Sequence, residues 1–435
     1  MKKNNFALGI GLALLLVSLF TWGYQLLNGL IVTNMRNPFS WGLYIATFAF
    51  FVGIAAGGLI VSSSVYLFNI EQLKPFTRIA SLSAFAGTLG AAAMILPDMG
   101  RVDRLYYLLL HPNFRSPLIW DVIVITTYMV LTFLSVYVQL LPDWKKEGRG
   151  FLNGWTKKLS QDQVQEVSRK WARRISVVGL PVAILIHTVT ALIFATQGSR
   201  GWWNTAVLPP DFIAMAVASG TALVMVIALL AVGKDNFAQY GGAFQTLARI
   251  VAGALAVHFF LVSVDLLMHW WWGSHEAKNL LHLLFGRYGW LYSAELVLPA
   301  FTMLYFFTKK GNGSFNSLIL GSILLFIGVF VHRMMLMYPA FNEFPLNITL
   351  PGMEVEGWSC PIALGQFQEG LPVFANFWPY APTLVEYLLT LLPFGLVLCV
   401  FSLAFRLYNF LPQQGQRGRY GEAEKISLSK KGLQL

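Results

Sequence analysis

Long apolar stretches alternate with shorter polar connections along almost the whole chain. Each stretch is close to the length of about 20 residues with which a helix crosses the hydrocarbon core of a bilayer. The stretches occupy residues 7–31, 41–68, 79–97, 119–142, 176–195, 211–233, 246–272, 289–308, 314–338 and 383–409. They do not alternate apolar and polar residues as the strands of a membrane barrel do. The pattern therefore predicts an all-α integral membrane protein with ten transmembrane helices, in a single polytopic domain over residues 1–435.

The connections suggest how these helices are grouped. We expect two four-helix bundles, helices 2–5 and helices 6–9 counted along the chain, flanked by helices 1 and 10. The connection 339–382 is long and rich in Pro, Gly, Phe and Trp. Its apolar aromatic residues would suit docking onto a partner subunit, or they could fold over the chain's own helices. The other long connection, 143–175, is basic.

Composition and charge place the chain in a membrane and orient it there. Hydrophobic residues make up 56% of the sequence and charged residues 12%, which excludes an ordinary soluble domain. If the N-terminus is cytoplasmic, 23 of the 31 Lys and Arg residues fall on the cytoplasmic side. The positive-inside rule therefore predicts that both termini, including the tail 410–435, are cytoplasmic, and that 339–382 is extracytoplasmic. The same anchors explain the net charge of +11 without nucleic-acid binding, and contact with membrane lipid is the expectation for 143–175.

Ionisable residues inside the helices carry most of the functional information, because charges are costly in a bilayer. On the seventh helix, His258, Asp265 and His269 are spaced i, i+7 and i+11, which places them on one stripe about 40° wide that rises roughly 16 Å towards the outer surface. Further ionisable residues lie in the outer halves of other helices: Asp121, Glu295, Arg333 and Glu386.

Such a gathering of protonatable groups would suit the chemistry of a carrier of two electrons and two protons. We predict a proton relay made of His258, Asp265, His269, Glu295, Arg333 and Glu386. Any one of these residues could instead be a hydrogen-bonded contact between helices. Because the inner halves of the helices are poor in ionisable groups, we expect protons to exchange mainly with the outer side. Water and the polar residues Ser62, Ser63, Ser64 and Tyr66 could complete an inner path as an alternative.

Histidine and cysteine usage bears on metal cofactors. A b-type haem needs two imidazoles that face each other across helices, and only His187 could pair with His258 in this way. Cys360 and Cys399 lie in different environments, and there is no CxxC pair. We therefore expect no haem, no iron–sulfur cluster and no metal site in this chain.

Several short motifs resemble those of the NrfD/PsrC family, the polysulfide-reductase-type membrane subunits. These motifs are Asn37-Pro-Phe-Ser-Trp-Gly-Leu-Tyr44, the glycine-rich Gly53-Ile-Ala-Ala-Gly-Gly58, Pro97-Asp-Met-Gly-Arg101, His187-Thr-Val-Thr190, Phe194-Ala-Thr-Gln197, Pro209-Pro-Asp-Phe-Ile-Ala214, Glu295, and Ala381-Pro-Thr-Leu-Val-Glu386. The chain is similar to the ten-helix members of the family.

The resemblance implies a quinone-reactive membrane anchor subunit of a respiratory oxidoreductase complex in a bacterial or archaeal cell membrane. Such a subunit exchanges electrons between menaquinone or ubiquinone and an extracytoplasmic iron–sulfur subunit. A catalytic subunit of molybdopterin, hydrogenase or multihaem type lies beyond. The chain would then be a non-autonomous part of an enzyme.

The resemblance also implies a quinone pocket at the outer end of the first bundle, within residues 37–142. Carried over residue by residue, it makes Asp98, Arg101 and Asp121 catalytic and gives quinone contacts to Trp41, Tyr44 and His111. Asp98 or Asp121 would accept a hydroxyl proton, and Arg101 would stabilise the developing negative charge. Trp41 and Tyr44 could instead anchor the membrane interface, and His111 is placed here only by its position in the 98–121 connection. Two other functions stay open, a polytopic transporter and a passive anchor without quinone chemistry.

Overall fold

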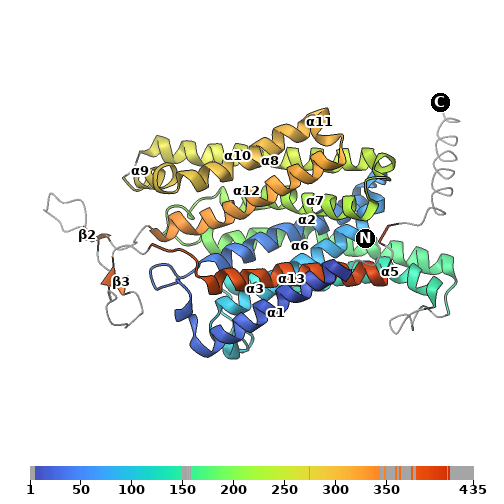
Figure 1. The fold of residues 1–435 in the computed structure, drawn as a ribbon, viewed down its shortest axis with the longest axis horizontal. Helices are drawn as coiled ribbons and strands as arrows, with labels where there is room; N and C mark the ends of the chain where they lie inside the picture. Colours follow the sequence, from blue (N-terminus) through green and yellow to red (C-terminus); the bar gives the residue numbers. More distant parts are fainter. Residues whose placement is uncertain are drawn as a thin grey trace.

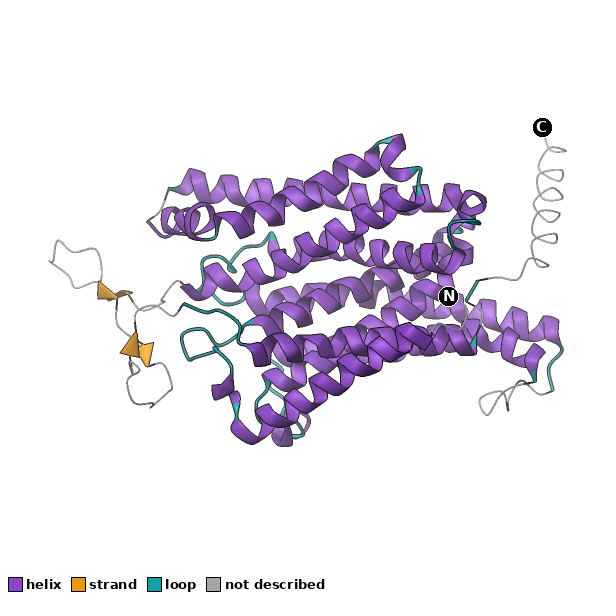
Figure 2. Cartoon of the chain, in the orientation of Figure 1, coloured by secondary structure: helices purple, strands orange, loops and turns teal. Residues whose placement is uncertain are grey.

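The protein is an assembly of long helices that run roughly side by side (Figure 1). The computed structural model describes residues 5–148, 154, 156, 158–273, 275–342, 379–408 and 410–411, together with four two-residue strands between 347 and 375. Helices account for most of this part of the chain, and the strands lie together at one end (Figure 2). Most of the 339–382 loop and nearly all of the 410–435 tail fall outside the described residues.

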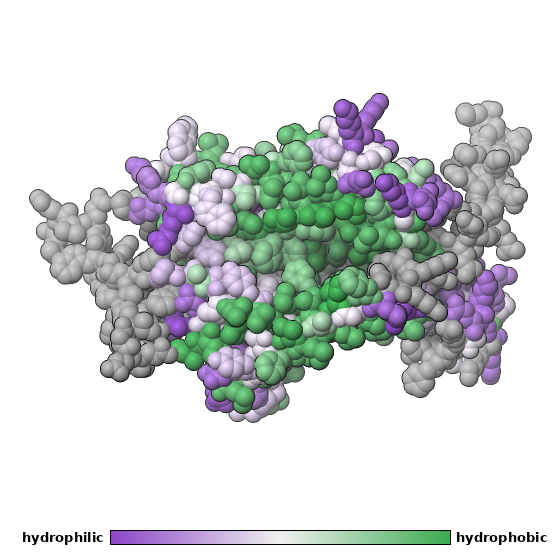
Figure 3. All heavy atoms as spheres, in the orientation of Figure 1, coloured by the Kyte–Doolittle hydropathy of each residue, from purple (hydrophilic) through white to green (hydrophobic). Residues whose placement is uncertain are grey.

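Ten of the described helices are long and apolar enough to cross a membrane, as the hydropathy pattern predicts. They are α1 (Asn5–Asn28), α2 (Leu43–Phe68), α3 (Thr77–Asp98), α5 (Pro117–Glu147), α6 (Gln161–Ala195), α7 (Leu208–Val232), α8 (Gly241–Trp272), α10 (Gly289–Phe307), α12 (Phe315–Asn342) and α13 (Leu384–Leu407). An apolar band crosses the middle of the face seen in Figure 3, and hydrophilic side chains gather towards the two ends of that face. The chain is therefore an all-helical, multi-pass membrane protein.

Shorter elements connect these helices. They are η1 (Leu30–Val32), η2 (Glu71–Phe76), η3 (Val102–Arg104), α4 (Tyr107–Leu110), η5 (Phe237–Tyr240), α9 (His275–His282), the π-helical turn η6 (Leu283–Arg287) and α11 (Lys309–Asn312). Strand β1 (Asn347–Ile348) pairs with β2 (Trp358–Ser359), and β3 (Ile362–Ala363) pairs with β4 (Phe374–Ala375), both antiparallel.

Helix α6 begins far earlier than the apolar pattern predicts. Its first turn is closed by a capping box, in which Ser160 and Gln163 satisfy each other's backbone N–H groups. Helix α5 likewise continues to Glu147 and ends at Gly148, which adopts φ 64°. Much of the basic 143–175 connection is therefore a continuation of α5 and α6, because polar residues with good caps extend a helix without needing lipid around it.

Helix contacts close two rings of four. Helices α2, α3, α5 and α6 contact one another in a ring, and so do α7, α8, α10 and α12. We call these the first ring and the second ring. Helix α1 packs on α13, and α13 packs on α3. Because α2 also packs against α7 and α12, the division into two separate bundles stays a prediction.

Glycines allow the two rings to approach closely. A Cβ atom added at Gly57 of α2 would lie 2.5 Å from the Cα atom of Gly220 on α7, and one added at Gly58 would lie 2.5 Å from the carbonyl oxygen of Ala80 on α3. Side chains at these positions would push helices apart. Both glycines are therefore explained by helix packing.

We expect Gly57→Val to destabilise the protein, because its side chain would collide with backbone atoms of α7. Overpacking of this kind costs about 1–3 kcal/mol or more. The unfolding midpoint of the purified protein in detergent measures the effect. Gly53→Ala is the matched control on the same helix, since its Cβ would meet only side-chain atoms at 3.7 and 3.8 Å. Equal midpoints for the two variants would contradict the close crossing.

Candidate functional site

A buried polar cluster lies where α3 ends, at the predicted outer end of the first ring. The Tyr44 hydroxyl, on a fully buried side chain of α2, donates to Oε1 of Gln25 on α1 at 2.6 Å. The Gln25 amide in turn donates to the carbonyl oxygen of Pro97 at 2.8 Å. The next residue is Asp98, whose Oδ1 atom is buried and has no hydrogen-bond partner among the described residues. Oδ1 of Asp98 is thus an unpartnered hydrogen-bond acceptor at the end of α3. The hydrogen bonds from Tyr44 through Gln25 to Pro97 fix the backbone next to it.

Glu386, at the start of α13, completes this group, which we call the Asp98 cluster: Asp98, Tyr44, Gln25 and Glu386. Its carboxylate accepts from the backbone N–H groups of Thr383 and Asn34, both at 2.9 Å, and from the Tyr380 hydroxyl at 2.5 Å. Burial and the neighbouring Glu386 raise the pKa of Tyr380, which therefore remains a donor. Glu386 also lies within electrostatic range of Asp98. Its bonds tie α13 to the α1–α2 connection.

Arg101 and His111 lie outside the buried cluster, on the surface segment that follows α3. The helix ends at Asp98, and the chain turns at Gly100, which adopts φ 65°. Arg101 then forms a two-pronged ion pair with Asp103, with Nε–Oδ1 at 2.9 Å and Nη2–Oδ2 at 2.8 Å, and both side chains are exposed. The Arg101 hydrogen bond lowers the pKa of Asp103. The imidazole of His111 is exposed and stacks near Tyr107, with ring centroids 5.9 Å apart.

The same segment exposes many large apolar side chains. They are Met99, Leu105, Tyr106, Tyr107, Leu109, Leu110, Phe114, Leu118 and Trp120. A surface of this composition is unusual next to a buried carboxylate and suits either lipid or a partner protein.

Trp41 belongs to an aromatic cluster between the rings. Its ring lies 5.8–6.3 Å from three others, those of Phe194, Trp203 and Phe341. Phe341 is a described aromatic residue of the 339–382 connection, and it is buried in this cluster.

Asp121 is buried on α5 and faces α6. Its Oδ1 atom lies 2.5 Å from the hydroxyl of Thr190, and that hydroxyl also lies 2.8 Å from the carbonyl oxygen of Ile186. Thr190 can therefore donate to a charged Asp121, or accept from a protonated one while donating to Ile186. Within the described part of the chain, no hydrogen bond joins Asp121 to Asp98.

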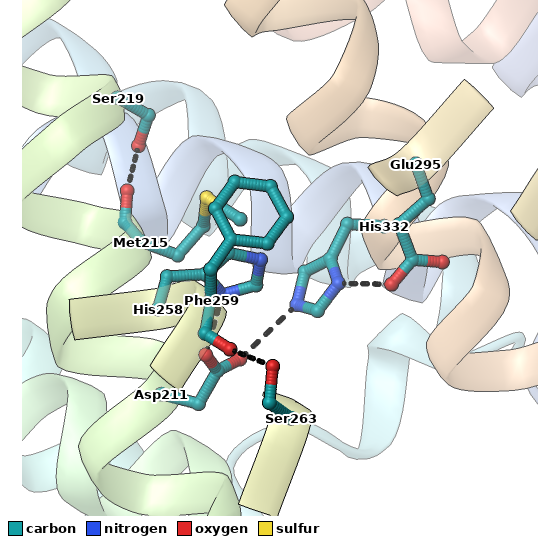
Figure 4. A network of polar contacts seen from close by, with 8 residues as sticks. All are labelled: Asp211, Met215, Ser219, His258, Phe259, Ser263, Glu295 and His332. Atoms are coloured by element: carbon teal, nitrogen blue, oxygen red, sulfur yellow. Dashed lines mark hydrogen bonds and ion pairs between the residues drawn. The ribbon is translucent and has the colours of Figure 1, made fainter. Parts of the chain in front are cut away.

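A second buried cluster lies in the second ring (Figure 4). Asp211 accepts from Nδ1 of His258 at 2.5 Å, and its other oxygen lies 3.4 Å from Nε2 of His332. Nδ1 of His332 lies 2.6 Å from Oε1 of Glu295. We call these four residues the Asp211 cluster. His332 therefore has a carboxylate near each of its ring nitrogens.

A small cavity adjoins the Asp211 cluster. It measures about 50 Å³ and is lined by Trp202, Thr205, Val207, Leu208, Asp211, Val262, Asp265, Leu266, Tyr292, Glu295, His332 and Leu336. Thr205 donates to Asp265 at 2.7 Å, and His269 donates to the backbone oxygen of Asp265 at 2.8 Å. The hydroxyl of Tyr292 and Oε2 of Glu295 are buried without partners in the described part of the chain. The space and its polar lining suit a few water molecules.

Arg333 lies next to this cluster and is fully buried. Its guanidinium carbon lies 3.9 Å from the ring centre of Phe212, and it interacts electrostatically with Asp211 and Glu295. None of its three side-chain nitrogens has a hydrogen-bond partner among the described residues.

The structure thus distributes the candidate residues over two clusters. It brings Asp98, Tyr44 and Glu386 together in the first cluster. In the second, Asp265 and Glu295 line the cavity, His258 bonds Asp211, His269 bonds the backbone of Asp265, and Arg333 interacts with Asp211 and Glu295. Two central members, Asp211 and His332, are not among the candidates drawn from the sequence. Both were visible as ionisable residues within apolar spans, which is the signal that could have identified them. Among the described residues, no three or more His, Cys, Asp or Glu side chains are placed so that they could hold a metal ion together.

Comparison with known proteins decides the family. The family model described as "Polysulphide reductase, NrfD" matches residues 31–345. The chain belongs to the NrfD family. The match confirms the resemblance carried by the sequence motifs, and it spans the helices from α2 to α12, including both rings.

Curated relatives of this NrfD-family chain resemble it over most of their length. It is 32% identical to the membrane subunit of a putative dimethyl sulfoxide reductase from Halobacterium salinarum, over 88% of this chain and 86% of the relative. It is 22% identical to a selenate reductase subunit from Mesobacillus selenatarsenatis, over 90% of each. It is 25% identical to an Hdr-like menaquinol oxidoreductase integral membrane subunit from Archaeoglobus fulgidus, over 94% of each.

Proposed function

We propose that this NrfD-family chain is the quinone-reactive membrane subunit of a respiratory oxidoreductase complex. It exchanges electrons between the quinone pool and an extracytoplasmic iron–sulfur subunit, beyond which lies a catalytic subunit. Its family and the names of its relatives, which are subunits of dimethyl sulfoxide, selenate and menaquinol oxidoreductases, support this function. Both termini face the cytoplasm in this proposal, and the Asp98 end faces outward.

The observation that carries the proposal is the unpartnered, buried oxygen of Asp98. Quinol oxidation releases two hydroxyl protons, and a buried carboxylate within reach of a hydroxyl is a suitable base. The Tyr44 hydroxyl donates its hydrogen bond to Gln25 and not to Asp98. The Asp98 carboxylate can therefore accept a hydrogen bond from a quinol hydroxyl. Asp121 offers a second buried carboxylate on the same side of the first ring, and Thr190 can follow its change of protonation.

The other candidate residues have supporting roles in this proposal. Arg101 and His111 lie at the rim, where a positive charge would stabilise negative charge on a quinol oxygen. Trp41 and Tyr44 shape the apolar side of the pocket. The exposed apolar segment from Met99 to Trp120, with the 339–382 loop, receives the iron–sulfur subunit. The menaquinone or ubiquinone is a substrate, and we propose that the chain itself carries neither haem nor iron–sulfur cluster.

The second ring holds the proposed proton relay, which consists of His258, Asp265, His269, Glu295 and Arg333. Glu386 acts with Asp98 in this proposal, since its hydrogen bonds hold the α1–α2 connection over the first ring. Protons leave on the outer side, because the cavity by Asp265 lies at that end.

We expect the purified complex to contain quinone and to reduce its iron–sulfur partner when quinol is added. Quinone extraction with chromatography and a spectroscopic record of cluster reduction measure both. Mass spectrometry of the co-purified subunits identifies the partner. A complex with no bound quinone and no quinol-dependent reduction would contradict the proposal and favour a passive membrane anchor. Uptake of a substrate into proteoliposomes without redox activity would favour a transporter instead.

A further inference from the structure

Two buried, unpartnered side chains lie between the two rings of helices. Arg333 on α12 is 0% exposed and His187 on α6 is 1% exposed. None of the three guanidinium nitrogens or the two imidazole nitrogens has a hydrogen-bond partner of good geometry among the described residues, and His187 has an electrostatic interaction with the backbone of Ala183 on its own helix. The two side chains interact electrostatically. Gly53 of α2 leaves room for about one further atom beside Arg333, since an added Cβ would lie 3.8 Å from Nη2 of Arg333 and 3.7 Å from Oγ of Ser219.

A guanidinium in this position needs solvation. It has five N–H donors, and the face of Phe212 attracts its charge without accepting all of them. Leaving such donors buried and unpaired is unfavourable, so buried groups of this kind are satisfied by ordered water where there is space. His187 offers one donor and one acceptor to the same water.

In the first ring, Thr190 lies between this pair and Asp121. His187 and Thr190 are three residues apart on α6 and therefore lie on the same side of the helix. The Thr190 hydroxyl contacts Asp121 at 2.5 Å and the carbonyl oxygen of Ile186 at 2.8 Å. When its hydroxyl accepts the proton of Asp121, Thr190 can release its own proton to a water molecule that reaches His187, and the hydroxyl is restored.

In the second ring, the pair lies next to the Asp211 cluster. Arg333 interacts with the carboxylates of Asp211 and Glu295. In the same cluster, Nε2 of His258 is buried and has no partner among the described residues, while its Nδ1 is held by Asp211. Nε2 is therefore an unpartnered nitrogen in the second ring, and Asp211, which holds the other nitrogen of this ring, lines the cavity together with Asp265.

We propose that His187 and Arg333 hold water between the two rings, and that His187 carries the proton of Asp121 from the first ring to the second. The inference rests on the proposed function. A quinol hydroxyl proton moves to the Asp121 carboxylate, and the quinol electrons go to the iron–sulfur partner. The proton then passes by way of Thr190 to a neutral His187 nitrogen, which restores the Asp121 carboxylate. Arg333 keeps its own charge, orients the water and repels a protonated His187, so the proton continues to His258 and leaves through the cavity.

The first test separates the first turnover from later ones. In the His187→Phe complex, Asp121 can still accept one proton, so we expect one fast turnover in stopped-flow experiments and later turnovers slowed about 100-fold. His187→Gln retains polar groups that can bind water but is a poor proton carrier, so its later turnovers are slowed as well. Thr188→Val is the control, because Thr188 is on the same helix and its exposed hydroxyl donates, among the described residues, to the carbonyl oxygen of Ile184 on that helix. Later turnovers at the wild-type rate in both His187 variants would overturn the proposed route.

The second test detects the water and does not depend on activity. Hydroxyl radicals generated by X-rays mark buried side chains that touch ordered water, and mass spectrometry locates the marks. We expect Phe212 to be marked in the wild-type complex and Phe76, which is equally buried among aromatic rings, to remain unmarked. In His187→Phe the marking of Phe212 should fall to the level of Phe76. If Phe212 is unmarked in the wild-type complex, the proposed water between the rings is contradicted. If Phe212 is marked but the wild-type complex oxidises no quinol, the proposed function is contradicted and the water is not.

Discussion

Replacing Asp98 with Asn is expected to reduce quinol-linked turnover by about 100- to 10,000-fold, the usual contribution of a positioned base. The amide has nearly the same shape but cannot take up a proton. Because Oδ1 of Asp98 has no partner among the described residues, the change removes no hydrogen bond at that atom, and the complex should assemble normally. Quinol-dependent reduction of the iron–sulfur partner, normalised to the amount of assembled complex, measures the effect.

Asp103→Asn is the matched control for this prediction. Asp103 lies five residues further along, is exposed and pairs with Arg101 on the surface, where an ion pair contributes little to stability. We expect its turnover to stay within a factor of two or so of the wild type. Wild-type turnover in Asp98→Asn would remove Asp98 from the site and leave Asp121 as the proposed base.

Replacing Asp211 with Ala is expected to destabilise the protein by about 3–5 kcal/mol, because it leaves buried partners of a charge network uncompensated. His258 would lose its 2.5 Å contact, and His332 would keep only one of its two carboxylates. The midpoint of unfolding in detergent should fall accordingly.

Asp235→Ala is the control for Asp211, since this carboxylate is exposed in the short connection between α7 and η5. Exposed substitutions of this kind usually change stability by no more than about 0.5 kcal/mol. An Asp211→Ala protein as stable as Asp235→Ala would show that the Asp211 cluster does not hold α7, α8, α10 and α12 together.

The family match sets the two flanking helices apart from the rest. It spans residues 31–345, so α1 and α13 lie outside it, although Gln25 of α1 and Glu386 of α13 both belong to the Asp98 cluster. The support of Tyr44 by Gln25 and of Asn34 by Glu386 therefore comes from helices beyond the matched region. In this chain the flanking helices are part of the candidate site.

The arrangement of polar residues within a single membrane helix was partly predictable from the sequence. The i, i+7, i+11 spacing on α8 predicts one polar stripe, and in the structure Asp265 lines the cavity while His258 bonds Asp211. The partners of that stripe were not predictable, because Asp211 is 47 residues and His332 is 74 residues away from His258 in sequence. Helical periodicity describes one helix at a time and says nothing about which face meets which neighbour.

The sequence by itself determined the ten membrane helices, because apolar length is a local property that lipid selects directly. Its motifs determined the family in the same way. Only the tertiary structure decided that Glu386 lies with Asp98, that Arg101 faces the surface, and that His187 and Arg333 meet between the rings. These arrangements depend on helix crossings such as that of Gly57 with Gly220, where atoms far apart in sequence fit against each other. Close packing of this kind is a property of whole helix pairs, and no single segment contains it.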